Sequence, residues 1–245
     1  MDSGFYAAMT GLVARSQALD TAASNLANTQ TPGYRAQREY FRAALLGPGA
    51  ADSQLGQTVN HYGLLGGDRI SLSQGALQPT GNPLDLAIEG QGFFAVETKS
   101  GVMYTRDGSF HRSQDGFLVT TAGEPVLSQE RKPIVLPPGD IAVGANGVRS
   151  VAGGTVGTVG VFDFASQVQL KAAGANRYVP PSDAKAFPAT GVELHQRALE
   201  SANEDPIQGT MDLIVMQRQF EMMQKALTIF HTEFNKIASE DLPRA

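Results

Sequence analysis

The sequence predicts an α+β protein in which long N- and C-terminal helices pair as a coiled coil and flank a central all-β domain of the sandwich or barrel type. Apolar residues recur every seven positions near the N-terminus, alternate with a period of two in the middle, and return to a heptad pattern near the C-terminus. We expect four segments: a helical, coiled-coil segment over 1–46, a linker and domain entry over 47–69, a β domain over 70–198 and a coiled-coil helix over 199–245.

The N-terminal segment is free of proline from Ser3 to Gln30, and only Arg15 and Asp20 are charged in this stretch. A helix on a protein surface ordinarily carries a charged face, so we expect neighbours on more than one side of this helix. Thr31-Pro32-Gly33-Tyr34 should end it, because proline disfavours helix at the residue before it. Residues 35–46 allow a second helix. The heptad stripe consists of Phe5, Leu12, Leu19 and Leu26.

The middle of the sequence has the period of β-strands. Leu84, Leu86 and Ile88 alternate with other residues, and short apolar runs separated by Gly and Pro follow. Asp107-Gly108 and Asp115-Gly116 are typical hairpin turns, which predicts successive hairpins here. The linker before this region is expected at 47–53, which is rich in Gly, Ala and Pro.

The C-terminal helix should begin at Asp205-Pro206, because Asp caps helices and Pro fits the first helical turn. Eight apolar side chains then follow a heptad pattern, and their burial is worth on the order of 12–24 kcal/mol. A surface of this size needs a partner, and the N-terminal stripe is the obvious one within the chain. The predicted packing residues are Leu213, Met216, Phe220, Met223, Leu227, Phe230, Phe234 and Ile237.

Composition argues against several classes of function. The 24 acidic and 19 basic residues give a net charge of -5, which is unsuited to nucleic acid. There is no cysteine, and the four histidines lack the spacing of a zinc site, so we expect no metal. No run of 18 apolar residues and no signal-peptide pattern is present, so we expect neither membrane insertion nor a cleaved signal peptide.

No enzyme motif stands in a suitable context. Residues 90–95 match a dinucleotide fingerprint in letters, but a strand is expected to follow where the fingerprint requires a helix. Serine-nucleophile and P-loop motifs are missing from the sequence. Asp107, Asp115 and Glu124 are conceivable glycosidase carboxylates, but each lies in a predicted turn, where Asp is common for other reasons. We expect a protein that is not an enzyme and has no cofactor.

Four blocks of sequence resemble the flagellar basal-body rod and hook family. The first, residues 22–34, ends the N-terminal helix with Asn25, Asn28 and Thr31-Pro32-Gly33-Tyr34. The sequence departs from the family pattern at residues 199–206, where Ala202 and Glu204 replace the usual Ser and Val. The other three blocks are residues 81–94, residues 104–110, and residues 217–221 with Lys225.

This resemblance implies a non-enzymatic axial subunit of the rod that crosses the periplasm. Its partners would be copies of itself, other rod and hook axial proteins, and the flagellar type III export apparatus, which would export it without cleaving a signal. In the family the terminal helices pair on the inside and the β domain faces outward. The length, the short connection after the first helix and residues 218–223 favour the proximal rod subunit, with the distal rod subunit as the close rival.

Two other classes remain open from the sequence. One is a secreted carbohydrate-binding or hydrolytic β protein with helical oligomerisation arms. The other is a regulator or chaperone of export, whose helical seam would bind a soluble partner.

Overall fold

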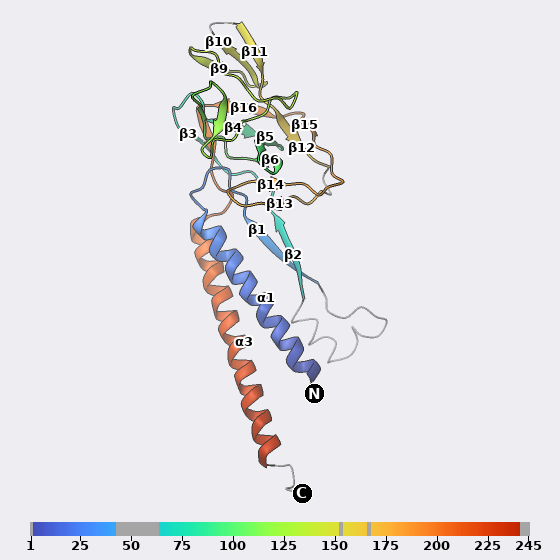
Figure 1. Ribbon diagram of the computed structural model, residues 1–245. Helices are drawn as coiled ribbons and strands as arrows, with labels where there is room; N and C mark the ends of the chain where they lie inside the picture. The colour runs from blue at the N-terminus through green and yellow to red at the C-terminus, as the bar shows by residue number, and fades with distance from the viewer. Residues whose placement is uncertain (1, 43–63, 152–153, 166–167, 241–245) are drawn as a thin grey trace. The chain divides into compact units, whose positions relative to one another are not determined.

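The computed structural model describes residues 2–42, 64–151, 154–165 and 168–240 (Figure 1). The chain divides into two compact units. Unit 1 consists of residues 1–27, 37–68 and 206–245, and unit 2 of residues 28–36 and 69–205. The linker predicted at 47–53 lies outside the described residues, and the four predicted segment boundaries remain predictions.

Two long helices and many short strands make up the described part of the chain. The helices are α1 (Asp2–Ala27) and α3 (Pro206–Glu240). The strands are β1 (Gln37–Arg42), β2 (Leu64–Ile70), β3 (Leu77–Pro79), β4 (Leu86–Glu89), β5 (Phe93–Thr98), β6 (Gly101–Thr105), β7 (Phe110–Arg112), β8 (Leu118–Thr120), β9 (Ile141–Val143), β10 (Val148–Val151), β11 (Gly154–Thr158), β12 (Val161–Asp163), β13 (Lys171–Ala172), β14 (Tyr178–Val179), β15 (Phe187–Pro188), β16 (Glu193–Gln196) and β17 (Ala198–Glu200).

The end of α1 and the start of α3 lie where the sequence predicts them. α1 ends at Ala27, before Thr31-Pro32-Gly33, and α3 begins at Pro206. Residues 35–46, which allowed a helix, contain strand β1 instead, and β1 pairs with β2 in unit 1. The β-branched or aromatic residues that favour strands are few in β1, so its partner strand determines the structure of this segment.

The coiled coil predicted for the terminal helices is wrong. α1 and α3 lie against each other in unit 1 (Figure 1). The described leucines of the α1 repeat are only half-buried and form no buried seam. Apart from Asn25, the buried positions among the described side chains of α1 are the small residues Gly11, Ala14 and Ala18. These side chains are too small to serve as the knobs that a coiled coil inserts into holes of the facing helix. The half-buried heptad residues of the two helices are Leu12, Leu19, Leu26, Leu213, Met216, Phe220, Met223 and Leu227.

The β domain was also predicted with the wrong architecture. Unit 2 is not one sandwich or barrel, because its strands belong to several separate sheets. The largest is antiparallel and has six strands in the order β13-β14-β6-β5-β12-β15. A three-stranded sheet has the order β11-β10-β9, and the two-stranded pairs are β16-β4, β17-β3 and β7-β8. Several of these pairs join strands that are far apart in the sequence, so local patterns did not reveal them.

Strand β5 lies between the two hydrophobic clusters of unit 2. Phe94 and Val96 belong to one cluster, whereas Phe93 and Ala95 belong to the other. Successive side chains of a strand point to opposite faces, so a strand with a core on each side reads as a continuous apolar run. This arrangement explains the sequence of residues 93–96, all of which are buried.

One of the two predicted Asp-Gly hairpins is present. β7 and β8 pair antiparallel across the turn that contains Asp115-Gly116. The hairpin expected at Asp107-Gly108 is wrong, because β6 pairs with β5 and β14 and not with β7. Gly108 instead approaches the main chain so closely that a Cβ there would lie 1.7 Å from the carbonyl oxygen of Leu86. Close approach, rather than turn geometry, accounts for this glycine.

Candidate functional site

The residues that follow α1 and those that precede α3 come together in unit 2. We call this cluster the connector site. It comprises the segments 31–36, 71–75, 105–107, 176–178 and 198–204.

The two connecting segments bond to each other through their main chains and through one side chain. The N–H of Gly33 donates to the carbonyl of Glu200 at 2.7 Å, and the N–H of Asn203 donates to the carbonyl of Tyr34 at 3.2 Å. The Asn203 side chain accepts from the N–H of Ala36 at 2.7 Å and donates to the carbonyl of Ser73 at 2.8 Å. One amide therefore satisfies main-chain groups of two different segments, as buried polar groups require.

Gly33 is at a position where other residues do not fit. Its φ of +64° lies in the left-handed region, and a Cβ would lie 2.3 Å from the carbonyl carbon of Arg106 and 2.4 Å from the nitrogen of Asp107. Both obstacles are main-chain atoms, which side-chain rotation does not relieve. Beside it, the carbonyl of Pro32 accepts from the amide of Asn176 at 2.6 Å. The Pro-Gly pair thus packs against residues 106–107 and 176 of unit 2 and also follows the end of α1.

A buried ion triad lies at the centre of the connector site. Arg35 Nη2 is 2.9 Å from Glu200 Oε1, and Arg106 Nη1 is 3.0 Å from Glu200 Oε2. The three side chains are only 1–3% exposed. Glu200 Oε1 also accepts from the N–H of Gly75 at 2.9 Å, and Arg106 Nη1 donates to the carbonyl of Ile88 at 3.0 Å. The carboxylate therefore joins the segments before α3 and after α1 to the β6 end of unit 2.

The triad holds two guanidinium groups and one carboxylate away from water. Burial lowers the pKa of Arg35, and it lowers the pKa of Arg106 to about 10, while the charge of Glu200 opposes both shifts. The Nε atoms of both arginines lack a hydrogen-bond partner. The guanidinium of Arg106 gains a further contact with the ring of Phe93, whose centroid is 5.6 Å from Cζ. Glu200 is the counter-charge on which both arginines depend.

Tyr178 completes the site from strand β14. Its hydroxyl accepts from the N–H of Arg35 at 3.0 Å and donates to Asn176 Oδ1 at 2.9 Å. Burial raises the pKa of Tyr178 to about 12, although the hydrogen bond from Arg35 opposes this shift. The phenol therefore remains a neutral donor across the physiological range.

The remaining motif residues order the chain before the connector site. In unit 1, Asn25 is buried; its side-chain amide donates to the carbonyl of Gln37 at 2.8 Å and accepts from the N–H of Gln37 at 2.9 Å. It thus pairs with β1 as a neighbouring strand would. In unit 2, the Thr31 N–H and hydroxyl donate to the carbonyl and side chain of Asn28 at 3.0 and 3.1 Å, and Tyr34 is buried. The motif of Asn, Thr, Pro, Gly and Tyr residues is therefore held by short-range hydrogen bonds and burial.

The predicted packing residues all lie on α1 and α3. Those whose side chains are described are half-buried, as given above. The side chains of Phe5, Phe230, Phe234 and Ile237 lie outside the described part of the structure. Their role in assembly remains a prediction.

Sequence reasoning missed Arg35, Arg106 and Glu200. The available signal was position: Arg35 directly follows the first family block, and Arg106 lies within the third. A periodic pattern does not reveal buried charges, because such residues are usually exposed. Two of the carboxylates considered for catalysis have structural contacts, since Asp107 accepts from the N–H of Ser109 at 3.0 Å and Glu124 lies 2.6 Å from Arg177.

Strand pairing also brings together a surface group that the sequence did not indicate. His195 on β16 lies 2.6 Å from Glu89 on β4, and the ligand atoms of these two residues and Glu193 lie within 4.8 Å of one another. Both carboxylates are exposed and His195 is half-exposed. A pair this exposed contributes little to stability.

Two family models match the chain. The model described as flagellar hook protein FlgE/F/G D1 domain matches residues 87–161, and the model described as flagella basal body rod protein matches residues 5–35. The first match covers β4 to β12 of unit 2, and the second ends at Arg35 in the connector site. Both descriptions are of flagellar proteins, which defines the class.

Relatives resemble the chain over nearly its whole length. The flagellar basal-body rod protein FlgF of Caulobacter vibrioides is 31% identical over 229 residues, which is 93% of each chain. FlgF of Rhizobium meliloti is 33% identical and covers 90% of each chain, and FlgG of Agrobacterium fabrum is 31% identical and covers 96% of this chain and 97% of its own. The chain therefore belongs to the flagellar basal-body rod protein family and is a structural subunit of the rod.

None of the described helices is both long and apolar enough to cross a membrane.

Proposed function

We propose that the chain is the proximal, FlgF-type subunit of the flagellar rod, and that it joins copies of itself and other rod and hook axial proteins through exposed apolar faces of its helices. It acts by packing rather than by catalysis. The proposal extends to export by the flagellar export apparatus and to a place in the part of the rod that crosses the periplasm, both of which rest on the family resemblance.

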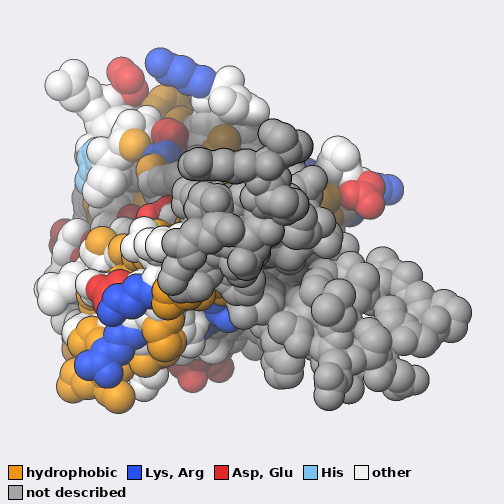
Figure 2. Space-filling view, turned by 90° about the horizontal axis from the view of Figure 1, so that it is seen from below, with side chains coloured by type: hydrophobic (Ala, Val, Ile, Leu, Met, Phe, Trp, Pro, Cys, Tyr) orange, Lys and Arg blue, Asp and Glu red, His pale blue; other side chains and the backbone are white. Residues whose placement is uncertain are grey.

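The observation that carries this proposal is an apolar face of α3 that the chain leaves in water. With 100° of rotation per residue, the exposed apolar side chains of this face lie within an arc of about 100° of the helix circumference. The same face carries Arg218 and Lys225. Figure 2 shows hydrophobic side chains at the surface of the molecule, with Lys and Arg side chains among them. The exposed apolar residues are Ile207, Met211, Ile214, Val215, Met222 and Ile229, which are 47–75% exposed.

An exposed apolar face on a helix is expected to be covered by another protein surface. A soluble monomer rarely exposes a continuous apolar surface along a helix without a functional reason. On α1, Met9 and Val13 are 40% and 53% exposed, so apolar side chains of both helices remain available to neighbours. In a rod, identical and related subunits supply complementary helices at high local concentration. The shortage of charges on α1 fits this environment, because a helix surrounded by other helices has little surface in water.

Two arguments support the proximal position. Relatives named FlgF are 31–33% identical to the chain, and those named FlgG are 29–31% identical. Residues 218–223 and the short connection after α1 also resemble the proximal subunit. Deletion of the gene tests this point by electron microscopy of purified basal bodies. Arrest at or below the proximal rod supports the proposal, whereas arrest with a complete proximal rod supports the distal subunit.

The assembly surface is tested by Met222→Glu, with Gln224→Glu as the matched control. Met222 is 62% exposed, so the charge should leave the isolated protein folded and abolish its incorporation into rods. Gln224 is an exposed polar residue of the same helix, and its variant should incorporate normally. The measurement is the amount of subunit in purified basal bodies, together with circular dichroism of the isolated variants. Normal incorporation of Met222→Glu would show that this face of α3 is not an assembly surface.

A further inference from the structure

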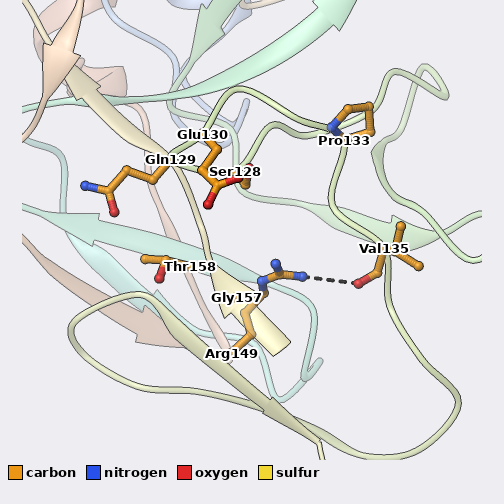
Figure 3. Close-up of a pocket in the computed structure, with 8 residues that line it drawn as sticks. All are labelled: Ser128, Gln129, Glu130, Pro133, Val135, Arg149, Gly157 and Thr158. Carbon is orange, nitrogen blue, oxygen red and sulfur yellow. Dashed lines mark hydrogen bonds between the residues drawn. The ribbon is translucent and has the colours of Figure 1, made fainter. Parts of the chain in front are cut away.

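Unit 2 contains a pocket of about 490 Å³ between the β10-β11 hairpin and the segment that follows β8. Figure 3 shows the guanidinium of Arg149 within it, between Gly157 and Thr158 on one side and the segment 128–130 on the other. The volume lies in the range of pockets that hold small ligands. The lining residues are Ser128, Gln129, Glu130, Pro133, Val135, Arg149, Gly157 and Thr158.

Arg149 is buried in this pocket without a counter-charge. Its side chain belongs to a residue that is only 5% exposed, and Nη1 donates to the carbonyl of Val135 at 3.2 Å. Nε has no hydrogen-bond partner, and no carboxylate of the described residues forms an ion pair with this guanidinium. In the triad, by contrast, Arg35 and Arg106 share Glu200. A buried charge without a partner is costly, and an anion would offset that cost.

The electrostatics agree with the geometry. Burial alone lowers the pKa of Arg149, and no neighbouring charge of the described residues counteracts the shift. Glu130 lies on the rim, but its carboxylate is 3.1 Å from Lys132 Nζ and both side chains are 76% exposed. The inner part of the pocket therefore carries one positive charge, whereas the whole chain carries a net charge of -5. A single negative charge matches it.

We propose that the Arg149 pocket binds a carboxylate group, which belongs either to a small organic acid or to an acidic side chain presented by a second copy of this chain. A guanidinium binds a carboxylate with charge-assisted hydrogen bonds, and the hydroxyls and amide of the lining supply further donors. The exposed side chain of Val135, at 54%, offers an apolar contact to the carbon chain of an acid. The negative rim residue Glu130 disfavours a doubly charged group such as phosphate.

Gly157 gives the guanidinium its space. A Cβ at this position would lie 2.6 Å from Arg149 Nη2, and the φ of Gly157 is +141°. A side chain here would displace the terminal nitrogens that a carboxylate must reach. The residue next to it, Thr158, lines the same pocket. The β11 strand thus combines a gap beside the cation with a hydroxyl group near it.

The test uses the full-length protein and the ¹⁵N–Hε NMR signal of Arg149 as a reporter, assigned by its loss in Arg149→Met. Sodium propionate, sodium phosphate and sodium chloride are titrated at matched ionic strength, and a separate series varies the protein concentration. Propionate carries a single carboxylate, and at ten times its dissociation constant it should also raise the melting temperature by about 3–6 °C. Arg149→Met should remove this rise, whereas the control Arg131→Met, a cation outside the pocket lining, should keep it.

The arms of the experiment distinguish the two sources. A saturable shift with propionate supports a small acid, and a shift with protein concentration alone supports a carboxylate from a second copy. No shift in either series overturns the proposal, as does a response to phosphate without one to propionate. An equal thermal response in Arg149→Met overturns it too, since the stabilisation would then arise elsewhere. None of these outcomes depends on whether the chain assembles into rods.

Discussion

Replacement of Glu200 by Gln tests the connector site at its centre. The change keeps the size of the side chain but removes the only carboxylate of the triad and points an amide N–H₂ group at a guanidinium. Arg35 and Arg106 would then remain charged and buried, with carbonyl groups as their remaining acceptors. Removing one partner of a buried ion pair costs about 3–5 kcal/mol, and here one carboxylate serves two cations. At about 2–4 °C per kcal/mol, the melting temperature should fall by about 6–20 °C.

Urea unfolding of the purified protein, followed by circular dichroism, measures this loss. Glu130→Gln is the matched control, because Glu130 also forms an ion pair but is 76% exposed, and its loss should cost about 0–1 kcal/mol. In an Arg35→Met background the effect of Glu200→Gln should shrink, since only one guanidinium then loses its counter-charge. If Glu200→Gln costs less than about 1 kcal/mol, as the control does, the triad does not hold the connecting segments together and our reasoning is refuted.

Three further predictions concern neighbouring residues. Gly33→Ala should destabilise the protein by more than about 3 kcal/mol in urea unfolding, because strain at positive φ adds to a main-chain clash. The control Gly81→Ala, with φ +81° and open space around it, should cost only about 1 kcal/mol. Equal losses in the two variants would contradict the clash. Burial raises the pKa of Tyr178 from its ordinary value of 10.0 to about 12 in the folded state, so the stability that its protonated phenol contributes is complete below pH 10 and is lost towards pH 12. Between pH 9 and pH 11 the free energy of unfolding should therefore fall by about 1.4 kcal/mol more in the parent protein than in Tyr178→Phe. Parallel pH profiles of the two proteins would refute this. Asn25→Ala should leave the main-chain N–H and carbonyl of Gln37 without their side-chain partner and reduce the free energy of unfolding by about 1–3 kcal/mol. Hydrogen exchange of the Gln37 amide should become faster. Unchanged exchange would argue against the hydrogen bonds described for this pair.

Local signals in the sequence predicted the end of α1, the start of α3 and one hairpin. Pro32 and Gly33 marked the end of α1, Pro206 marked the start of α3, and the Asp115-Gly116 turn marked a hairpin. Each of these features depends on the backbone preferences of a few adjacent residues. The family motifs were also found from adjacent residues, and the similarity of the chain to rod proteins confirms the family.

Features that depend on distant residues were not predicted. β4 pairs with β16 and β3 with β17, across more than 100 residues in each case, so a count of short strands suggested one sandwich or barrel where several sheets exist. The leucine repeat of α1 showed that a helix forms but not which face is buried, and the buried residues proved to be small ones such as Ala14 and Ala18. A heptad period identifies an apolar stripe, whereas side-chain size decides how closely a neighbour packs.

The connector site was missed for a different reason. Its central residues are charged, and nothing in a single sequence distinguishes a buried Arg from the exposed arginines that are far more common. Glu200 and Arg35 are separated by most of the chain. They meet only because the segment that follows α1 and the segment that precedes α3 lie next to each other in unit 2. The motif containing Gly33 was recognised by resemblance, but its physical basis, the close approach to the main chain of Arg106, needed the structure.

The position of the triad gives it a mechanical consequence for a rod subunit. Residues 28–36 follow α1 and residues 198–205 precede α3, and within unit 2 both segments are bonded to Glu200 or to its neighbours. The two segments therefore share one carboxylate. Apolar packing alone would resist separation but allow sliding, because it has no direction. Ion pairs and hydrogen bonds of fixed geometry resist both, so the triad favours one arrangement of the two segments within unit 2.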